Sequence, residues 1–223
     1  MRVSVECAPS YAMAYCYLDV NESLMVESGA MTAMSDGMGV TAAAPGGAVK
    51  AALRKLAGGE SFFMGKYTAA VEQAWVAVAP KYPGDIAAVT LSGQTIIAEA
   101  GSFLASADGV SMSVVSGNVT SMLMKEGITL LKFTGYGDLL LCSYGGMQMF
   151  ELNEGQSIII DTGHVVGYTD TVDVSVGPLT SISSSFATGE GLAMRATGPG
   201  YVWLQTRAEQ QLKSWLMPSR NQN

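Results

Sequence analysis

The chain has 223 residues and a formal net charge of −7, from 12 basic and 19 acidic side chains. This excess of negative charge repels phosphate backbones, which disfavours nucleic acid as a partner. Hydrophobic residues make up 48% and charged residues 14%, with 26 glycines, a composition typical of a globular protein with many turns. The uncharged stretch 109–124 is too short and too rich in Ser, Gly and Asn for a membrane-spanning helix, which needs roughly 20 apolar residues.

The N-terminal segment and the cysteines favour a cytoplasmic location. Glu6 and Pro9 interrupt any apolar run, and no signal-peptide core follows them. The cysteines Cys7, Cys16 and Cys142 are odd in number, widely spaced and without a CxxC pair. We therefore expect reduced, mostly buried thiols.

A block of fourteen residues occurs three times without a gap, at 23–36, 95–108 and 157–170. The copies read SLMVESGAMTAMSD, TIIAEAGSFLASAD and SIIIDTGHVVGYTD. Each copy shares an acid at its fifth place, glycine at its seventh and aspartate at its last, namely Glu27, Glu99 and Asp161, then Gly29, Gly101 and Gly163, then Asp36, Asp108 and Asp170. This joint agreement indicates an internal repeat.

The similarity continues after each block as an alternating run, a segment able to make a helical turn, a glycine and a further strand-like run. The resulting repeats span about 11–80, 81–146 and 147–206 within a single domain, 1–223. Period-two patterning and Asp-Gly turns predict β-strands, and the central glycine is expected at a bulge or bend. The sequence thus predicts a mainly β fold, with three pseudo-symmetric β repeats packed as a sandwich or barrel-like domain and short helices between them.

Two segments are predicted to be helical. In the stretch 48–56, Val49, Leu53 and Leu56 recur at helical spacing and three basic residues are left for solvent, which makes peripheral membrane contact one hypothesis.

The second segment is a C-terminal helix over 207–217, ended by Pro218. It groups Leu212, Trp215 and Leu216, and we expect it to be a lid docked on a sheet rather than a recognition helix.

Several segments together resemble a known family. They are the ESGAM and AGSFLAS parts of the blocks, GGESFFMGKY, PGDIAAV and GEGLAMRATGPGYVWLQTR. In this order they are similar to the mitochondrial biogenesis proteins named for altered inheritance of mitochondria, and to their bacterial relatives. The resemblance implies a fold like that of the tryptophan-RNA-binding attenuator protein, with three β repeats around a pseudo-threefold axis. Its mitochondrial members are associated with inner-membrane organisation, which implies scaffolding more than catalysis, and no site residue is carried over.

The residues offer little for catalysis. His164 is the one histidine, and its counterparts in the other blocks are Ala30 and Ser102, so we expect a structural or solvent-exposed role. No GxSxG elbow or phosphate-loop motif is present, and TGYGDL and TGPGYVW are predicted to be β turns. We expect no enzyme and no cofactor.

The repeated acids are the candidate metal ligands. If Glu27, Glu99 and Asp161 faced a common axis, their oxygens could bind a hard cation such as Ca²⁺. Alternatively, these acids accept hydrogen bonds from turn amides or stay solvated, and the final aspartates make turns.

The favoured function is a non-catalytic β scaffold that forms a homo-oligomer and mediates protein or membrane-complex interactions. The alternative is a small-molecule or metal-binding module on the pseudo-threefold axis or under the C-terminal helix.

Overall fold

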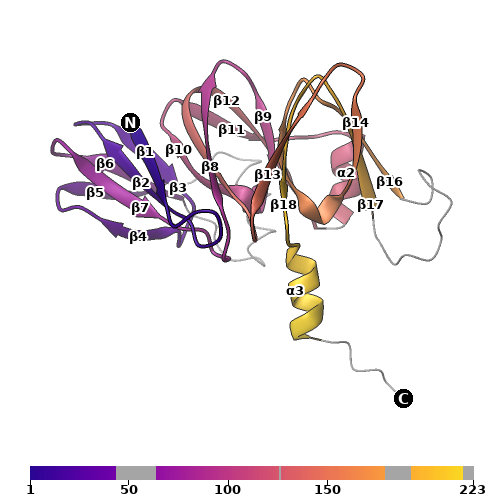
Figure 1. The fold of residues 1–223 in the computed structure, drawn as a ribbon. Helices are drawn as coiled ribbons and strands as arrows, with labels where there is room; N and C mark the ends of the chain where they lie inside the picture. The colour runs from indigo at the N-terminus through magenta and orange to yellow at the C-terminus, as the bar shows by residue number, and fades with distance from the viewer. Residues whose placement is uncertain (44–63, 126, 179–191, 218–223) are drawn as a thin grey trace.

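The computed structural model describes residues 1–43, 64–125, 127–178 and 192–217, which form three groups of strands set side by side (Figure 1). The first group contains β1 (Arg2–Glu6), β2 (Met13–Leu18), β3 (Ser23–Val26), β4 (Met31–Met34), β5 (Met38–Ala43), β6 (Met64–Ala69) and β7 (Ala74–Val78). The second contains β8 (Ile86–Ser92), β9 (Ile96–Glu99), the 3₁₀ turn η1 (Ala100–Ser102), β10 (Phe103–Ala107), β11 (Val110–Val114), helix α2 (Asn118–Lys125) and β12 (Leu130–Cys142). The third contains β13 (Met147–Leu152), β14 (Ser157–Asp161), η2 (Thr162–His164), β15 (Val165–Thr169), β16 (Asp173–Pro178), β17 (Leu192–Thr197) and β18 (Gly200–Gln205), followed by helix α3 (Glu209–Leu216).

The alternating patterns form strands with one buried face. In β2, Ala14, Cys16 and Leu18 are buried, while Tyr15 and Tyr17 between them are half-buried. This is the expected result when successive side chains of a strand point to opposite faces. The predicted mainly β fold with a C-terminal helix is confirmed.

The strands pair antiparallel in three sheets. Their orders are β1-β2-β7-β4, β13-β18-β15-β9-β12-β10-β3-β6-β5 and β14-β17-β16, with β8 and β11 also paired to β12. The largest sheet therefore passes through all three groups, at junctions where β3 pairs with β10 and β9 pairs with β15. Among the described residues the sheets stay open and sandwich-like, so the barrel-like alternative is wrong.

The long strand β12 connects the layers of the second group. It pairs with β9 and β11 through its first part and with β10 and β8 through its last part. Gly135 has a φ of +113°, and a side chain there would collide with the carbonyl oxygen of Gly109, so this close crossing requires glycine. The stretch TGYGDL therefore lies inside a strand, and its prediction as a β turn is wrong; TGPGYVW does form the β17–β18 turn.

Three hydrophobic clusters fill the interior. The central one contains the stacked rings of Phe103 and Phe133, whose centroids lie 5.5 Å apart, and Leu131, Leu139 and Leu141 of β12. The large apolar side chains of β12 thus bury against both layers, which explains why this strand carries most of the pairing in the second group.

Each fourteen-residue block forms a strand, a short turn and a second strand, namely β3 and β4, β9 and β10, and β14 and β15. Each second strand has one register shift against its neighbouring strand, between Met31 and Ala33, between Phe103 and Ala105, and between Val165 and Gly167. The predicted bulge thus follows the central glycine rather than containing it. The relation of the blocks by a pseudo-threefold axis stays a prediction.

The repeated glycines meet different requirements. Gly29 has a φ of +84°, which favours glycine, whereas Gly101 and Gly163 lie in η1 and η2. The last residues of the blocks are exposed and lie at turns, namely Asp36, Asp108 and Asp170.

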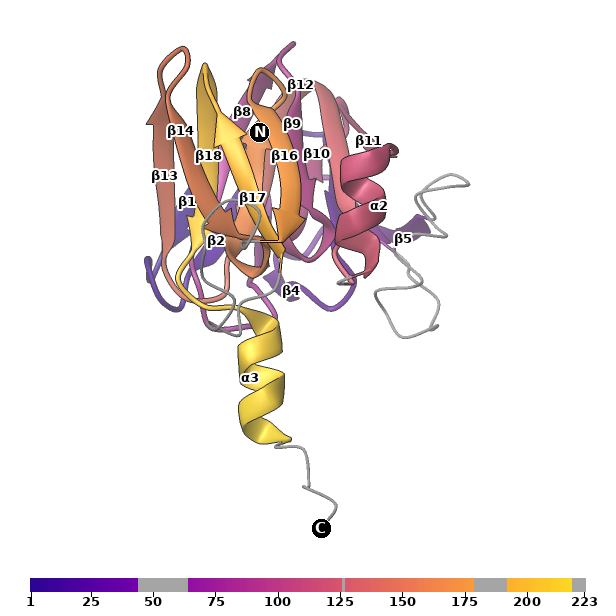
Figure 2. The same ribbon diagram turned by 90° about the vertical axis from the view of Figure 1, so that its right-hand side faces the viewer.

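The predicted helix at 48–56 lies outside the described residues. The expected C-terminal helix forms as α3, which projects from the body of the molecule (Figures 1 and 2). In the part of the chain that the structure describes, no helix is long and apolar enough to cross a membrane.

Candidate functional site

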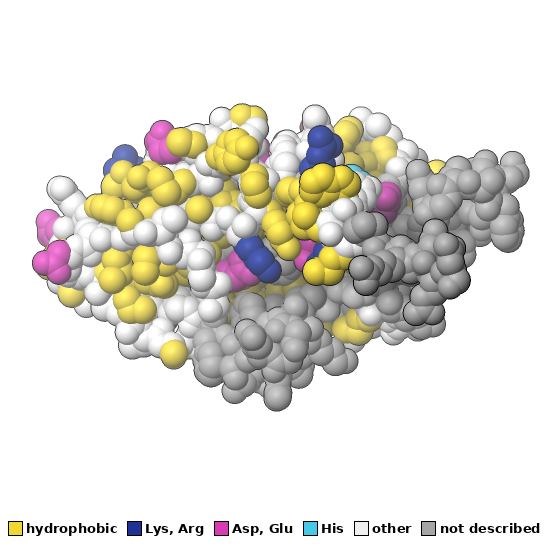
Figure 3. All heavy atoms as spheres, turned by 90° about the horizontal axis from the view of Figure 1, so that it is seen from below, with side chains coloured by type: hydrophobic (Ala, Val, Ile, Leu, Met, Phe, Trp, Pro, Cys, Tyr) yellow, Lys and Arg dark blue, Asp and Glu magenta, His cyan; other side chains and the backbone are white. Residues whose placement is uncertain are grey.

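Two of the three repeated acids, Glu27 and Glu99, lie at the junctions between strand groups. Glu27 directly follows β3 and Glu99 ends β9. The backbone N–H of Glu27 donates to the carbonyl oxygen of Leu104 in β10, at 2.9 Å. The two carboxylates are close enough for the charge of Glu99 to act on Glu27. Seen from below, acidic and basic side chains lie next to one another among hydrophobic ones near the middle of the molecule (Figure 3).

The Glu99 carboxyl group holds its proton unusually strongly. Burial raises the pKa of Glu99 to about 7. The backbone amides of Gly101 and Ser102 and the Ser102 hydroxyl bind the carboxylate and oppose this rise, while the charge of Glu209 adds to it. A side chain at Gly101 would begin 2.9 Å from Oε2 of Glu99, so glycine at this place leaves room for the carboxylate.

Glu27 is affected in a similar way. Burial raises its pKa to about 7, the positive charge of Lys81 opposes the rise, and the charge of Glu99 adds to it. Two neighbouring acids with pKa values near neutrality titrate together, so the charge of the pair changes around physiological pH. This change of charge with pH is the chemistry that the pair itself offers.

The third repeated acid is placed differently. Asp161 is exposed, and its carboxylate accepts a hydrogen bond from the backbone N–H of Gly163 at 3.1 Å, which caps η2. This is the turn-capping role that the sequence left open as an alternative. No group of three or more His, Cys, Asp or Glu side chains among the described residues is arranged to hold a metal ion.

The buried thiols provide no activated nucleophile. Burial raises the pKa of Cys16 to about 12, and it raises that of Cys142 further, helped by the charges of Glu27 and Glu99. Since the thiolate is the reactive form, both thiols are protonated and inert at neutral pH. Cys7 is exposed, and all three cysteines are free.

The acids are connected to helix α3 through Glu209. Its Oε1 accepts a hydrogen bond from the Tyr82 hydroxyl at 2.9 Å and lies 2.7 Å from Nζ of Lys213. Burial acts to raise the pKa of Glu209, but the hydrogen bonds from Lys213 and Tyr82 hold it below its ordinary value. The Tyr82 ring packs against Tyr144, with centroids 5.2 Å apart.

Sequence reasoning did not find the residues that surround the acid pair. Lys81, Tyr82 and Glu209 lie outside the repeated blocks. No spacing signal points to them, and only the pairing of distant strands brings them to the acids.

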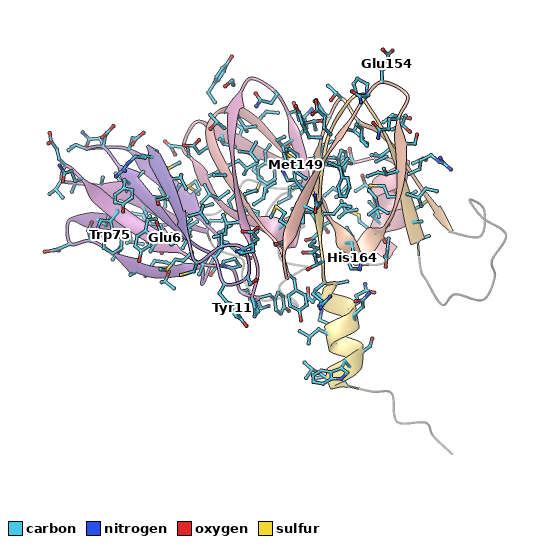
Figure 4. All side chains as sticks on the ribbon, viewed as in Figure 1. Glu6, Tyr11, Trp75, Met149, Glu154 and His164 are labelled. Carbon is cyan, nitrogen blue, oxygen red and sulfur yellow. The ribbon has the colours of Figure 1, made fainter. Side chains whose placement is uncertain are left out.

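His164 has a structural role at the start of α3 (Figure 4). Its Nδ1 lies 2.7 Å from the carbonyl oxygen of Gln205 and must donate, because a carbonyl only accepts. Nε2 can then accept from the side-chain amide of Gln211, at 3.5 Å. The imidazole therefore links η2 to β18 and α3 by hydrogen bonds, which agrees with the structural role expected from the sequence.

Helix α3 is not the expected lid, because none of its residues is buried. The exposed fractions of Trp215 and Leu216 are 77% and 60%, and that of Met217 just after the helix is 82%. The hydrogen bonds of Glu209 and His164 attach only its first turns. Of the apolar side chains expected beneath the helix against a sheet, Trp215 and Leu216 instead face solvent, and Leu212 is half-buried.

A separate groove of about 410 Å³ lies over β8 and β13. Its apolar lining includes Met147, Met149 and Trp203, and Asp85 is the one charged residue of the lining. Met149 is more than half exposed here. Neither Glu27 nor Glu99 lines this groove.

Comparison with known proteins matches residues 3–207 to the family described as Mitochondrial biogenesis AIM24. The chain belongs to this family. An uncharacterized protein of Streptococcus pyogenes serotype M6 is 25% identical over 235 residues, covering 99% of this chain and 93% of that protein. A crystal structure of a Streptococcus pyogenes protein has the same fold, with a TM-score of 0.75 and 24% identity, covering 96% of this chain and 97% of that one.

Membership of the AIM24 family confirms the resemblance inferred from the sequence segments. The likeness to the streptococcal structure shows the fold alone. The roles of Glu27, Glu99 and α3 therefore have to be argued from the geometry of this chain.

Proposed function

We propose that this chain is a non-catalytic β scaffold that self-associates and binds protein partners through exposed apolar surface. Helix α3 carries this proposal. An isolated helix shorter than about 12–15 residues is marginal in water, yet α3 has eight residues and none of them buried. Contact with another protein surface would supply the missing burial.

The side chains on α3 suit such a contact. Trp215, Leu216 and Met217 lie together at the end of the helix and are mostly exposed. Trp is enriched among the residues that dominate binding energy at interfaces, and Met adapts to irregular surfaces. A lack of catalysis is supported by the inert buried thiols and by the engagement of His164 with a backbone carbonyl.

The test compares the full chain with the double variant Trp215→Ser, Leu216→Ser. We expect the wild-type chain to be larger than a monomer by light scattering, and the double variant to lose mass or to lose a partner captured from extracts. Tyr136→Ser is the matched control, since Tyr136 is an aromatic residue on β12 with an exposed fraction of 71%. A wild-type chain that stays monomeric and captures nothing would refute the proposal.

One observation favours small-molecule binding as a second candidate. The groove over β8 and β13 is lined mostly by apolar side chains together with one carboxylate, that of Asp85, and ligand sites usually combine the two in this way. Native mass spectrometry of freshly purified protein should then show added mass that disappears in Met149→Lys. An unchanged bare-chain mass under gentle conditions would remove this candidate.

A further inference from the structure

The two internal junctions join the same places of the fourteen-residue block in the same register. At the first, β10 pairs with β3 through Ala105↔Val26, Ser106↔Met25 and Ala107↔Leu24. At the second, β15 pairs with β9 through Gly167↔Ala98, Tyr168↔Ile97 and Thr169↔Ile96. Counted along each block, places 11, 12 and 13 of one copy face places 4, 3 and 2 of the preceding copy. The second strand of each later block therefore recognises the first strand of the block before it.

A third junction of this kind would join β4 of the first block to β14 of the last. Within the described ranges, β4 pairs only with β7, and β14 pairs only with β17. The two strands belong to the groups at opposite ends of the molecule (Figures 1 and 2). The chain thus presents one half of the junction at each end and does not bring the halves together.

The side chains at these edges are exposed where their counterparts are covered. At place 12, Ser106 and Tyr168 have exposed fractions of 3%, whereas Met34 has 39%. At place 3, Met25 and Ile97 pack against hydrophobic clusters, whereas Ile159 has an exposed fraction of 47%. Both free edges are therefore apolar surfaces, and no described strand takes the place of the neighbour seen at the other two junctions.

Neither edge carries the usual protection against pairing. Lys and Pro are common on strand edges that must stay unpaired, but β4 reads MTAM and β14 reads SIIID. The opposite edge of the β14 sheet is β16, which ends in Pro178. Of the two edges of this sheet, β14, which corresponds to an internal junction, is thus the one without a proline that would hinder pairing.

We propose that β14 of one copy pairs with β4 of a second copy of this chain, in the register of the internal junctions. Ile160 then faces Ala33, Ile159 faces Met34, and Ile158 faces Ser35. This inference rests on the self-association proposed above and assigns it to these two strand edges, which leaves the exposed end of α3 for the binding of other proteins. Because the two edges differ, the contact is head-to-tail, and it gives rings if the rotation closes or filaments if it does not.

The direction of the backbone N–H groups in β14 shows where a proline would block pairing at the free edge without removing a hydrogen bond inside the chain. The N–H of Glu27, at place 5, bonds to Leu104 in β10, and the carbonyl of Ser23, at place 1, accepts from the N–H of Asp108 directly after β10. Backbone groups alternate sides along an antiparallel strand, so the N–H at place 3 points the same way. In β14 this is the N–H of Ile159, which faces the free edge, where proline is tolerated.

Ile159→Pro is therefore expected to reduce the mass seen by light scattering to that of the 23.3 kDa monomer, with an unchanged melting temperature. Ile159→Lys should act the same way through charge. The matched control is Val40→Lys, which replaces an equally exposed aliphatic side chain on the edge strand β5 and should leave the assembly intact.

Cross-linking tests the register itself. Places 3 and 12 form a hydrogen-bonded pair, whose Cα atoms are typically about 5.5 Å apart, within the range for a disulfide. In a Cys7→Ala background, a mixture of Met34→Cys and Ile159→Cys chains should form a mixed disulfide dimer. A mixture of Met34→Cys and Val40→Cys chains should not.

The outcomes separate this inference from the proposed function. A wild-type chain that is monomeric overturns the edge pairing, and one that also captures no partner overturns the proposed function as well. An assembly that survives Ile159→Pro and Ile159→Lys and yields no mixed disulfide overturns the edge pairing and leaves self-association through α3. If Ile159→Pro does not fold, as its melting curve would show, Ile159→Lys and the cross-link decide.

Discussion

Replacing Glu99 by Gln should remove part of the loss of stability that the folded chain suffers as the pH rises. The pKa of Glu99 is about 7 in the folded chain, against an ordinary value of 4.5. As the pH rises from 4.5 to 7, the unfolded chain loses this proton while the folded chain keeps it. The contribution of the group to stability is therefore complete below pH 4.5 and is lost as the pH passes through 7. Gln cannot ionise, so the variant escapes this loss.

The size of the effect follows from the shift. A change of one pKa unit corresponds to about 1.4 kcal/mol, so a rise from 4.5 to about 7 gives at most about 3 kcal/mol. Because Glu99 retains some exposure and titrates together with Glu27, we expect about 1–3 kcal/mol at pH 8. For a chain of this length that is about 2–4 °C in Tm per kcal/mol. At pH 4 the variant should match the wild-type chain, and at pH 5 the difference should still be below about 1 kcal/mol.

Urea titrations of both chains at pH 4, 5, 6, 7 and 8 would measure this difference. Glu154→Gln is the matched control, because Glu154 is exposed in the turn before β14, and it should change stability by less than about 0.5 kcal/mol at every pH. If Glu99→Gln were destabilising by the same amount at pH 5 and pH 8, the carboxyl group would be ionised in the folded chain throughout. The reasoning about its burial would then be wrong.

Two further predictions concern packing and thiols. Gly84→Ala should destabilise by about 1–3 kcal/mol, because the added carbon would collide with the backbone oxygen of Ser143; in thermal melts, Gly146→Ala, which has ordinary contacts, should change little. In the native chain at pH 8, a thiol reagent should modify Cys7 rapidly and the buried pair Cys16 and Cys142 only after denaturant is added. Equal rates for all three thiols would contradict their burial.

Local patterns predicted the strands well because burial on one face leaves a period of two in the sequence. The blocks at 23–36, 95–108 and 157–170 each form two strands around a short turn. The error at TGYGDL has a physical cause, since its glycines allow a close crossing of strands as readily as a turn. Gly135 requires a positive φ inside β12, and nothing local distinguishes that from a hairpin.

The candidate site was only partly predictable, because it depends on pairing between distant segments. The sequence marked Glu27 and Glu99 as equivalent, but their raised pKa values come from burial at the junctions and from each other. The sequence predicted where α3 lies in the chain, but the prediction that it docks on a sheet as a lid is wrong. Helical spacing shows that Trp215 and Leu216 each lie next to Leu212 on the helix surface, but it does not show whether this chain supplies the surface that covers them.

The repeated acid shows how neighbouring groups determine the environment of an equivalent residue. The backbone N–H of Glu27 bonds to β10 of the next group. The charge of Glu209, which follows the third group, raises the pKa of Glu99. Asp161 occupies the same place in the last of the three blocks, where no strand of a further group lies beside it among the described residues, and it is exposed. In the proposed pairing, β4 of a second copy takes the position that β10 has beside Glu27, so the N–H of Asp161 meets the carbonyl of Thr32. The environments of the three acids would then become alike, because the same block recognises its neighbour both within one chain and between two.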